Sequence, residues 1–338
     1  MKKWFKISFS LSLLAILMFS LAACNSDSQP KTKKLEKVRI AEVTRSIFYA
    51  PEYVAIEKGF FKAEGLNIEL MTTAGGDKTM TTLLSNGADV ALVGSETSIY
   101  VYAQGASDPV INFAQLTQTD GTFLVSREKI AHFSWDQLNG TTFLGQRKGG
   151  MPQMVGEFVL KNHGIDPQKD LKLIQNIEFA NIANAFASGT GEFVQLFEPT
   201  ASIFEKEGKG HIVASFGTES GHVPYTTFMT KQSYMKEHKA TVEKFTHAIY
   251  KAQQWVKTHS AEEIAKAIQP YFPDTELGLI KTVVDRYKSQ GSFATDPILD
   301  KQEWNNLQNI MKEAGELPKA VDHTTLVNTA IAEKVIKN

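Results

Sequence analysis

Several kinds of functional site are excluded by what the 338-residue chain lacks. It contains a single cysteine, Cys24, so it can form neither an intramolecular disulfide nor a zinc site built from cysteines. The eight histidines are scattered outside any His-Glu-x-x-His pair, so we predict no metal and no cofactor. The formal net charge of −1 supplies no basic field, so we expect no nucleic-acid partner.

Common motifs of hydrolysis and nucleotide binding are also absent. No Gly-x-Ser-x-Gly elbow occurs in the chain. The glycine-rich stretch at 145–150 lacks the Gly-Lys-Ser/Thr ending of a nucleotide-binding phosphate loop. We therefore predict that the protein is not an enzyme and has no catalytic residue. The length and the 42% hydrophobic content instead predict a globular protein that divides into more than one lobe.

The N-terminal 23 residues have the pattern of an export signal. Lys2 and Lys3 precede an apolar run at 7–21, which is short for a membrane-spanning helix. Leu-Ala-Ala then leads into Cys24, a placement that resembles a bacterial lipobox, where the cysteine receives a diacylglycerol group and becomes the first residue. We predict a lipoprotein signal peptide at 1–23, a flexible tether at 24–36, and a protein anchored by lipid on the extracytoplasmic face of the cell membrane. An ordinary secretory signal and an uncleaved anchor are the alternatives.

Residues 38–70 predict the first strand–helix–strand unit. Residues 38–43 alternate apolar and polar side chains like a strand, Pro51 suits the first turn of a helix, and Gly59 suits its end. The connecting loop follows the carboxyl end of the first strand, which is where open α/β sheets bind ligands. Its candidate binding residues are Thr44, Arg45, Phe48 and Tyr49. The two rings could stack on a planar ligand, although each of these side chains could instead belong to the core or to the surface.

Two glycine-rich turns are candidate anion sites. Gly75 and Gly76 precede a helix, and Gly149 and Gly150 precede another that starts near Met151. Free backbone N–H groups at a helix start can hold an anion, and Arg147 and Lys148 add positive charge beside the second turn. A plain turn and a solvated basic loop are the respective alternatives.

A family resemblance accompanies these patterns. The string EKGFFK at 57–62, between Pro51 and the Glu-Gly-Leu at 64–66, resembles the opening of the solute-binding proteins of the sulfonate, taurine, nitrate and thiamine-pyrimidine-precursor importers. Residues 85–90 resemble the small-Gly-x-Asp-hydrophobic signature of that family, and the resemblance runs from about Lys37 to the end of the chain.

The resemblance implies an α/β, two-lobed, periplasmic-binding-protein-like fold. Two open sheets would be flanked by helices and separated by a ligand cleft. Residues 120–125 and 225–230 resemble the two hinge crossovers that connect the lobes in the family. The predicted lobe 1 consists of 37–123 and 228–338, and the predicted lobe 2 of 124–227. The implied function is to bind a small solute and deliver it, as a monomer, to an ABC permease and its ATPase subunit, with membrane contact through the lipid anchor only.

The resemblance also adds candidate residues to the cleft. Ser95 and Glu96 open a helix, Gln118 and Asp120 follow a strand, and Glu198 belongs to a Glu-Pro pair that recurs in the family. The predicted ligand-binding residues are Thr44, Arg45, Phe48, Tyr49, Gly75, Gly76, Ser95, Glu96, Gln118, Asp120, Gly149, Gly150, Met151 and Glu198.

Two classes of ligand stay open. A sulfonate-like or nitrate-like anion would use Arg45, Arg147 and the glycine turns. A pyrimidine-like heterocycle, slightly favoured because the predicted cleft is acidic, would use the group formed by Phe48, Tyr49, Glu96, Asp120 and Glu198. The alternative functions are a pyrimidine-precursor enzyme of the same superfamily, whose cysteine-rich motif is absent here, and a surface adhesion or sensory lipoprotein.

Overall fold

The computed structural model describes residues 34–337. The predicted signal peptide, Cys24 and nearly all of the predicted tether lie outside the described residues. Within the described part, none of the helices combines the length and the apolar character needed to span a bilayer.

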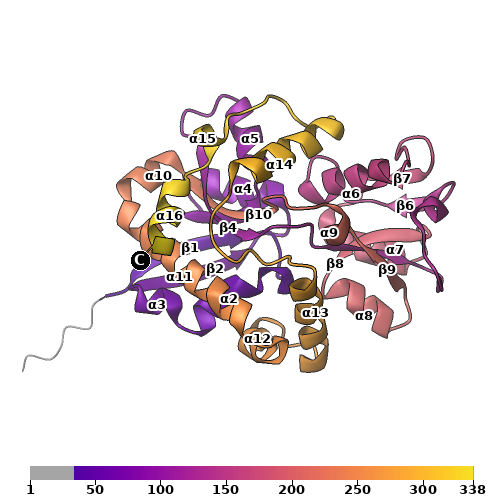
Figure 1. The fold of residues 1–338 in the computed structure, drawn as a ribbon, viewed down its shortest axis with the longest axis horizontal. Helices are drawn as coiled ribbons and strands as arrows, with labels where there is room; N and C mark the ends of the chain where they lie inside the picture. The colour runs from indigo at the N-terminus through magenta and orange to yellow at the C-terminus, as the bar shows by residue number, and fades with distance from the viewer. Residues whose placement is uncertain (1–33, 338) are drawn as a thin grey trace, which may run out of the picture. The chain divides into compact units, whose positions relative to one another are not determined.

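Two five-stranded sheets form the framework of the fold (Figure 1). The first sheet has the order β2 (Leu66–Thr72), β1 (Glu36–Glu42), β3 (Val90–Gly94), β10 (Thr226–Lys231) and β4 (Val110–Thr117). The second has the order β7 (Lys172–Ile174), β6 (Thr142–Leu144), β8 (Phe193–Phe197), β5 (Thr122–Ser126) and β9 (His211–Ser215). The expectation of a two-lobed α/β fold with two open sheets is therefore confirmed.

Each sheet mixes parallel and antiparallel pairing in the same way. β1 is parallel to β2 and β3, while β10 is antiparallel to β3 and β4. In the second sheet, β6 is parallel to β7 and β8, while β5 is antiparallel to β8 and β9. The antiparallel strand in each sheet is the one that the chain enters when it crosses from the other sheet.

Helices flank both sheets (Figure 1). Those of the first sheet and its C-terminal extension are α2 (Ala50–Glu57), α3 (Phe60–Ala63), α4 (Gly76–Leu84), α5 (Glu96–Ala103), α10 (Gln232–Glu237), α11 (Lys239–Thr258), α12 (Ala261–Ile268), α13 (Leu277–Ser289), α14 (Lys301–Glu313), α15 (His323–Leu326) and α16 (Thr329–Lys337). Those inserted with the second sheet are α6 (Met151–Asn162), α7 (Ile182–Ala187), α8 (Thr200–Lys206) and α9 (Phe216–Glu219). Short 3-10 turns occur at η1 (Ile47–Tyr49), η2 (Trp135–Leu138), η3 (Phe179–Asn181) and η4 (Gln269–Tyr271).

The signals for the first helix act as the sequence predicts. Pro51 lies in the first turn of α2, where its missing N–H has no partner to lose. Gly59 adopts a φ of 73°, the left-handed conformation that separates α2 from α3. Asp77, in contrast, does not cap α4, because Gly75 occupies the N-cap position and the Asp77 side chain pairs with Arg147 instead.

The two crossings between the sheets lie slightly earlier than the predicted lobe boundaries. The chain leaves the first sheet after β4, crosses at 118–121, and returns after α9 at 220–225. The predicted boundaries at 123/124 and 227/228 therefore fall inside β5 and β10. Those strands begin directly at the end of each crossing, and nothing in their apolar sequence marks where the crossing stops. Gly121 is needed in the first crossing, because a Cβ there would lie 2.7 Å from Cζ of Phe48.

Candidate ligand-binding cleft

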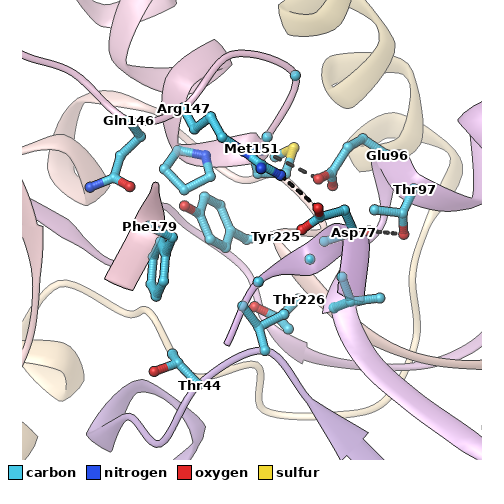
Figure 2. A pocket seen from close by; sticks show the side chains of 18 of the residues that line it. Thr44, Asp77, Glu96, Thr97, Gln146, Arg147, Met151, Phe179, Tyr225 and Thr226 are labelled. Carbon is cyan, nitrogen blue, oxygen red and sulfur yellow. Dashed lines mark hydrogen bonds and ion pairs between the residues drawn. The ribbon is translucent and has the colours of Figure 1, made fainter. Parts of the chain in front are cut away.

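A cavity of about 190 Å³ lies where loops from the two sheets meet (Figure 2). From the first sheet come the segments that follow the carboxyl ends of β1 and β3, represented by Thr44 and Glu96. From the second come the loop after β6 and the start of α6, represented by Gln146 and Met151. Both lobes thus contribute the edge at which mixed α/β sheets bind ligands.

Glu96 is the acidic group at the centre of this arrangement. It begins α5, its residue surface is 4% exposed, and its Oε1 accepts the backbone N–H of Met151 from the other lobe at 3.3 Å. Its Oε2 is buried and has no hydrogen-bond partner among the described residues. Burial raises the pKa of Glu96 to about 8, although the backbone N–H groups of Glu96 itself and of Met151 oppose the rise. The carboxyl group is therefore mostly neutral at pH 7 in the structure as it stands.

A glycine makes room for this carboxyl group. A Cβ at Gly94 would lie 2.7 Å from Cδ of Glu96, closer than real contacts allow. The glycine at the end of β3 therefore lets the Glu96 side chain fold back beside the strand. The hydroxyl of Thr97 also returns to this strand end, donating to the carbonyl of Gly94 at 2.7 Å.

Aromatic rings form much of the wall. The rings of Tyr49, Phe179, Phe197 and Tyr225 line the cavity, and Phe179 and Phe197 lie with their centroids 6.0 Å apart. Phe48 lies behind them, 1% exposed, with its ring centroid 5.6 Å from that of Tyr225. Phe48 therefore supports the wall rather than lining the cavity.

The basic side chains near the cavity are already paired. Arg147 contacts Asp77 at 3.0 Å across the cleft and Glu178 at 3.1 Å (Figure 2). Lys148 contacts Glu316 at 3.5 Å.

Backbone donors of the glycine turns are also engaged. The N–H of Gly75 donates to the carbonyl of Val43 at 3.1 Å, and that of Gly149 donates to Oε1 of Gln153 at 2.9 Å. Together with the bond from Met151 to Glu96, these contacts use N–H groups that the sequence suggested for an anion. No group of three or more potential metal-ligating side chains occurs in the described part of the chain.

Eight of the fourteen predicted ligand-binding residues line the cavity. They are Thr44, Tyr49, Gly75, Gly76, Glu96, Gly149, Gly150 and Met151. They come from four segments that are distant in sequence and that the strand ends bring together.

The other six do not line this cavity, and their role in binding stays a prediction. A neighbouring cavity of about 200 Å³, which shares Thr44, Gln146, Phe179 and Phe197 with the first, is lined by Arg45 and Glu198.

Two of the six, Arg45 and Phe48, share the first loop with Tyr49. Arg45 turns back to pair with the buried Glu42 at 3.2 Å, because a buried carboxylate needs a cation nearby. Its guanidinium also lies over the ring of Tyr271, at 5.2 Å from the centroid.

The remaining four are polar groups with internal partners. Glu198 pairs with Arg286 and accepts the backbone N–H of Ser202 at 2.9 Å. Asp120 accepts the backbone N–H of Thr122 at 2.6 Å, and burial raises its pKa to about 6. Ser95 occupies the N-cap of α5 but donates to the carbonyl of Pro224, and Gln118 donates to the carbonyl of Gly291 at 2.9 Å. These hydrogen bonds and the ion pair stabilise the crossings and the second lobe, and the four side chains do not line the first cavity.

Other lining residues were not in the predicted set. They are Val43, Ala74, Asp77, Val93, Gly94, Thr97, Tyr100, Gln146, Arg147, Lys148, Pro152, Glu178, Phe179, Phe197, Tyr225 and Thr226. Gln146 could have been found, because it follows β6 as Thr44 follows β1. Phe179 carries no such signal, since it stands in an irregular segment after β7.

Comparison with known sequences identifies the family of this two-lobed fold. The sequence model of the NMT1-like family matches residues 32–269. The chain belongs to the NMT1-like family. A relative in Bacillus subtilis (strain 168), named "Putative binding protein YtlA", is 66% identical to this NMT1-like chain over 335 residues, covering 99% of each.

Solved structures agree in fold with this NMT1-like chain. The alkanesulfonate-binding protein SsuA from Xanthomonas axonopodis pv. citri, bound to MOPS, has a TM-score of 0.68 and 17% identity, covering 88% of this chain and 99% of that one. The desulfurization enzyme DSZB has a TM-score of 0.63 and 12% identity, covering 89% and 99%. At such identities the likeness concerns the fold alone. The family match and the likeness in fold agree with the predicted periplasmic-binding-protein-like fold.

Proposed function

We propose that this NMT1-like protein is an extracytoplasmic solute-binding protein that holds one small solute between its lobes and delivers it to an ABC importer. The observation that carries the proposal is the cavity, which is lined by loops from both sheets, while the described part of the chain crosses between the sheets at 118–121 and 220–225. Two short crossings permit hinge closure around a solute. Closure excludes water and strengthens each hydrogen bond to the ligand.

Cell location and partners form the rest of the proposal. Cys24 would carry the lipid anchor after removal of residues 1–23, and the tether would leave the two lobes free outside the membrane. The partners would be an ABC permease and its ATPase subunit, and the binding protein would deliver the solute to them as a monomer.

Two ligand classes compete for the cavity. The paired state of Arg147 and Lys148 weakens the case for a sulfonate-like or nitrate-like anion. The rings of Tyr49 and Tyr225, together with the buried carboxyl of Glu96, favour a pyrimidine-type heterocycle. The sulfonate-containing MOPS bound to SsuA is what supports the anion.

Thermal unfolding in the presence of candidate solutes tests the proposal. The full chain, purified in detergent, would be heated with alkanesulfonates, taurine, nitrate, aminopyrimidines, thiamine and riboflavin. A solute present at about 100 times its Kd should stabilise the folded state by about 2.7 kcal/mol. Stoichiometric binding without product is the expected result, whereas product formation would favour an enzyme with the DSZB fold. Stabilisation by none of the solutes would contradict the proposed function and favour an adhesion or sensory role.

A further inference from the structure

We infer that Glu96 determines which solutes the cavity accepts: its carboxyl group takes a hydrogen bond from an amine or amidinium group on a planar ligand and rejects ligands that place an anionic group there. This role of Glu96 rests on the proposed function, because it requires that the cavity be the solute site. The ligand class is therefore a planar, donor-bearing cation or amine.

The position of the carboxyl group is the first support. The N–H of Met151, from the opposite lobe, holds Oε1 of Glu96 at 3.3 Å, so the side chain is oriented when the lobes are together. Oε2 is then left buried against Gly94, without a hydrogen-bond partner among the described residues, in a side chain that lines the cavity. A buried acceptor without a partner costs about 1–3 kcal/mol, which a ligand donor would recover.

The surroundings of Glu96 are the second support. The titratable groups that interact with it electrostatically include the phenols of Tyr49, Tyr100 and Tyr225, whose pKa values burial raises further above neutral pH, so they carry no charge. Further away, the charges across the cleft are paired with one another, as Asp77 and Glu178 with Arg147, and Glu316 with Lys148. No cation in the described part of the chain contacts Glu96, so a ligand would supply the first one.

The charge of the ligand follows from this environment. An anion beside Glu96 would keep the carboxyl protonated, and Arg147 and Lys148 could pair with that anion only by leaving their present carboxylate partners. A planar cation would meet both the carboxylate and the faces of the surrounding rings, which attract positive charge. The aromatic wall and the carboxyl group thus select for the same ligand class.

Binding of a permanent cation should release a proton. In the empty cavity the Glu96 carboxyl carries the proton, since burial raises its pKa to about 8. When the cation binds, the O–H bond of Glu96 breaks, the proton goes to solvent, and the carboxylate pairs with the ligand. Affinity for a cation should then weaken by up to about tenfold for each pH unit below about pH 8.

Matched aromatic probes of opposite charge test this role. Benzamidine would be compared with benzoate and benzenesulfonate by calorimetric titration of the full chain in detergent, between about pH 6.5 and about pH 8.5. Glu96→Gln keeps an acceptor for the N–H of Met151 but turns an amide donor towards the cavity. Glu303→Gln is the control, because Glu303 is another buried carboxyl whose pKa is raised, to about 7, and it lies outside the cavity.

The expected result is selective binding of benzamidine that strengthens with pH. Glu96→Gln should weaken benzamidine binding by about tenfold or more, remove its pH dependence and improve the binding of benzoate. Glu303→Gln should leave both affinities within about twofold of the original chain. Binding of the anionic probes by the original chain, or benzamidine binding that is insensitive to Glu96→Gln, would overturn the role of Glu96 but not the proposed function.

The two hypotheses fail in different ways. If no probe binds but a solute from the wider panel does, an unchanged affinity of that solute in Glu96→Gln overturns the role of Glu96, and a loss of about tenfold supports it. If neither the probes nor the panel bind, the proposed function fails and the role of Glu96 fails with it.

Discussion

At the scale of single residues, the cavity depends on a glycine beside a carboxyl group. Gly94 ends β3, and its lack of a Cβ leaves space for the side chain of Glu96 two residues later. The neighbour that an added Cβ would meet is the far end of a flexible side chain, not the backbone. Substitution of Gly94 should therefore move the carboxyl group while leaving the strand in place.

We predict that Gly94→Ala weakens ligand binding far more than it weakens the fold. The displaced Glu96 carboxyl would lose the N–H of Met151, so solute affinity should fall by about tenfold. The free energy of unfolding should change by only about 1 kcal/mol, because the side chain can rotate away. Urea unfolding and calorimetric titration with benzamidine measure the two effects.

A matched glycine provides the control for this change. Gly278 lies in α13, and an added Cβ there meets nothing within 4 Å. Gly278→Ala should leave solute affinity unchanged and stabilise the helix by about 0.5–1 kcal/mol. Equal solute affinities of Gly94→Ala and the original chain would contradict the proposed placement of Glu96.

At the scale of secondary-structure elements, α13 connects the C-terminal helices to the second lobe. Arg286 of α13 pairs with Glu198, before α8, and donates to Oγ of Ser202 at 2.9 Å. The next residue, Tyr287, donates its hydroxyl to the carbonyl of Gly121 in the first crossing at 2.8 Å. One helix face thus contacts both the crossing and the start of α8.

We predict that Arg286→Met destabilises the chain by about 3 kcal/mol, the lower end of the range for breaking a buried ion pair. The Glu198 side chain is fully buried, so it would be left without a cation, whereas Arg286 itself is 27% exposed at its side chain. Urea unfolding measures the loss. The double variant Arg286→Met with Glu198→Gln should recover part of it, and a double variant as unstable as the single one would argue against the ion pair as the cause.

At the scale of the whole molecule, buried acids make stability depend on pH. Burial raises the pKa of Glu96 to about 8 and that of Glu303 to about 7, above the value of 4.5 for exposed glutamate. At pH values between 4.5 and these raised pKa values, the folded chain binds more protons than the unfolded chain. Its stability must then fall as the pH rises.

We predict that the thermal midpoint of the ligand-free protein is about 5–10 °C lower at pH 9 than at pH 6, because the two raised pKa values correspond to a loss of about 3–4 kcal/mol over that range. Calorimetry at the two pH values measures the difference. The variant that combines Glu96→Gln and Glu303→Gln should show a smaller difference, since neither side chain can then lose a proton. A midpoint that rises towards pH 9 in the original chain would contradict the protonated state assigned to the two acids.

The amino-acid sequence by itself determined the local structure and the family. Alternation in the first strand, Pro51 at the start of α2 and Gly59 at its end follow from short-range sterics and hydrogen bonding, and each was predictable from its immediate neighbours. The carboxyl ends of strands also indicated where Thr44, Tyr49 and Glu96 would lie relative to a cleft, because parallel strands bring those ends to one edge.

Tertiary structure alone decided which polar and aromatic side chains face the cavity. Arg45 and Glu198 were predicted as ligand contacts, and each is paired with a side chain that only folding brings close, Glu42 and Arg286 respectively, at a cavity beside the first one. Phe179 and Tyr225 enter the wall from distant segments. The reason is that a buried charge must be paired and an aromatic ring must fill space in the core. The neighbours that meet both requirements come together only on folding, so the spacing of residues along the sequence does not reveal them.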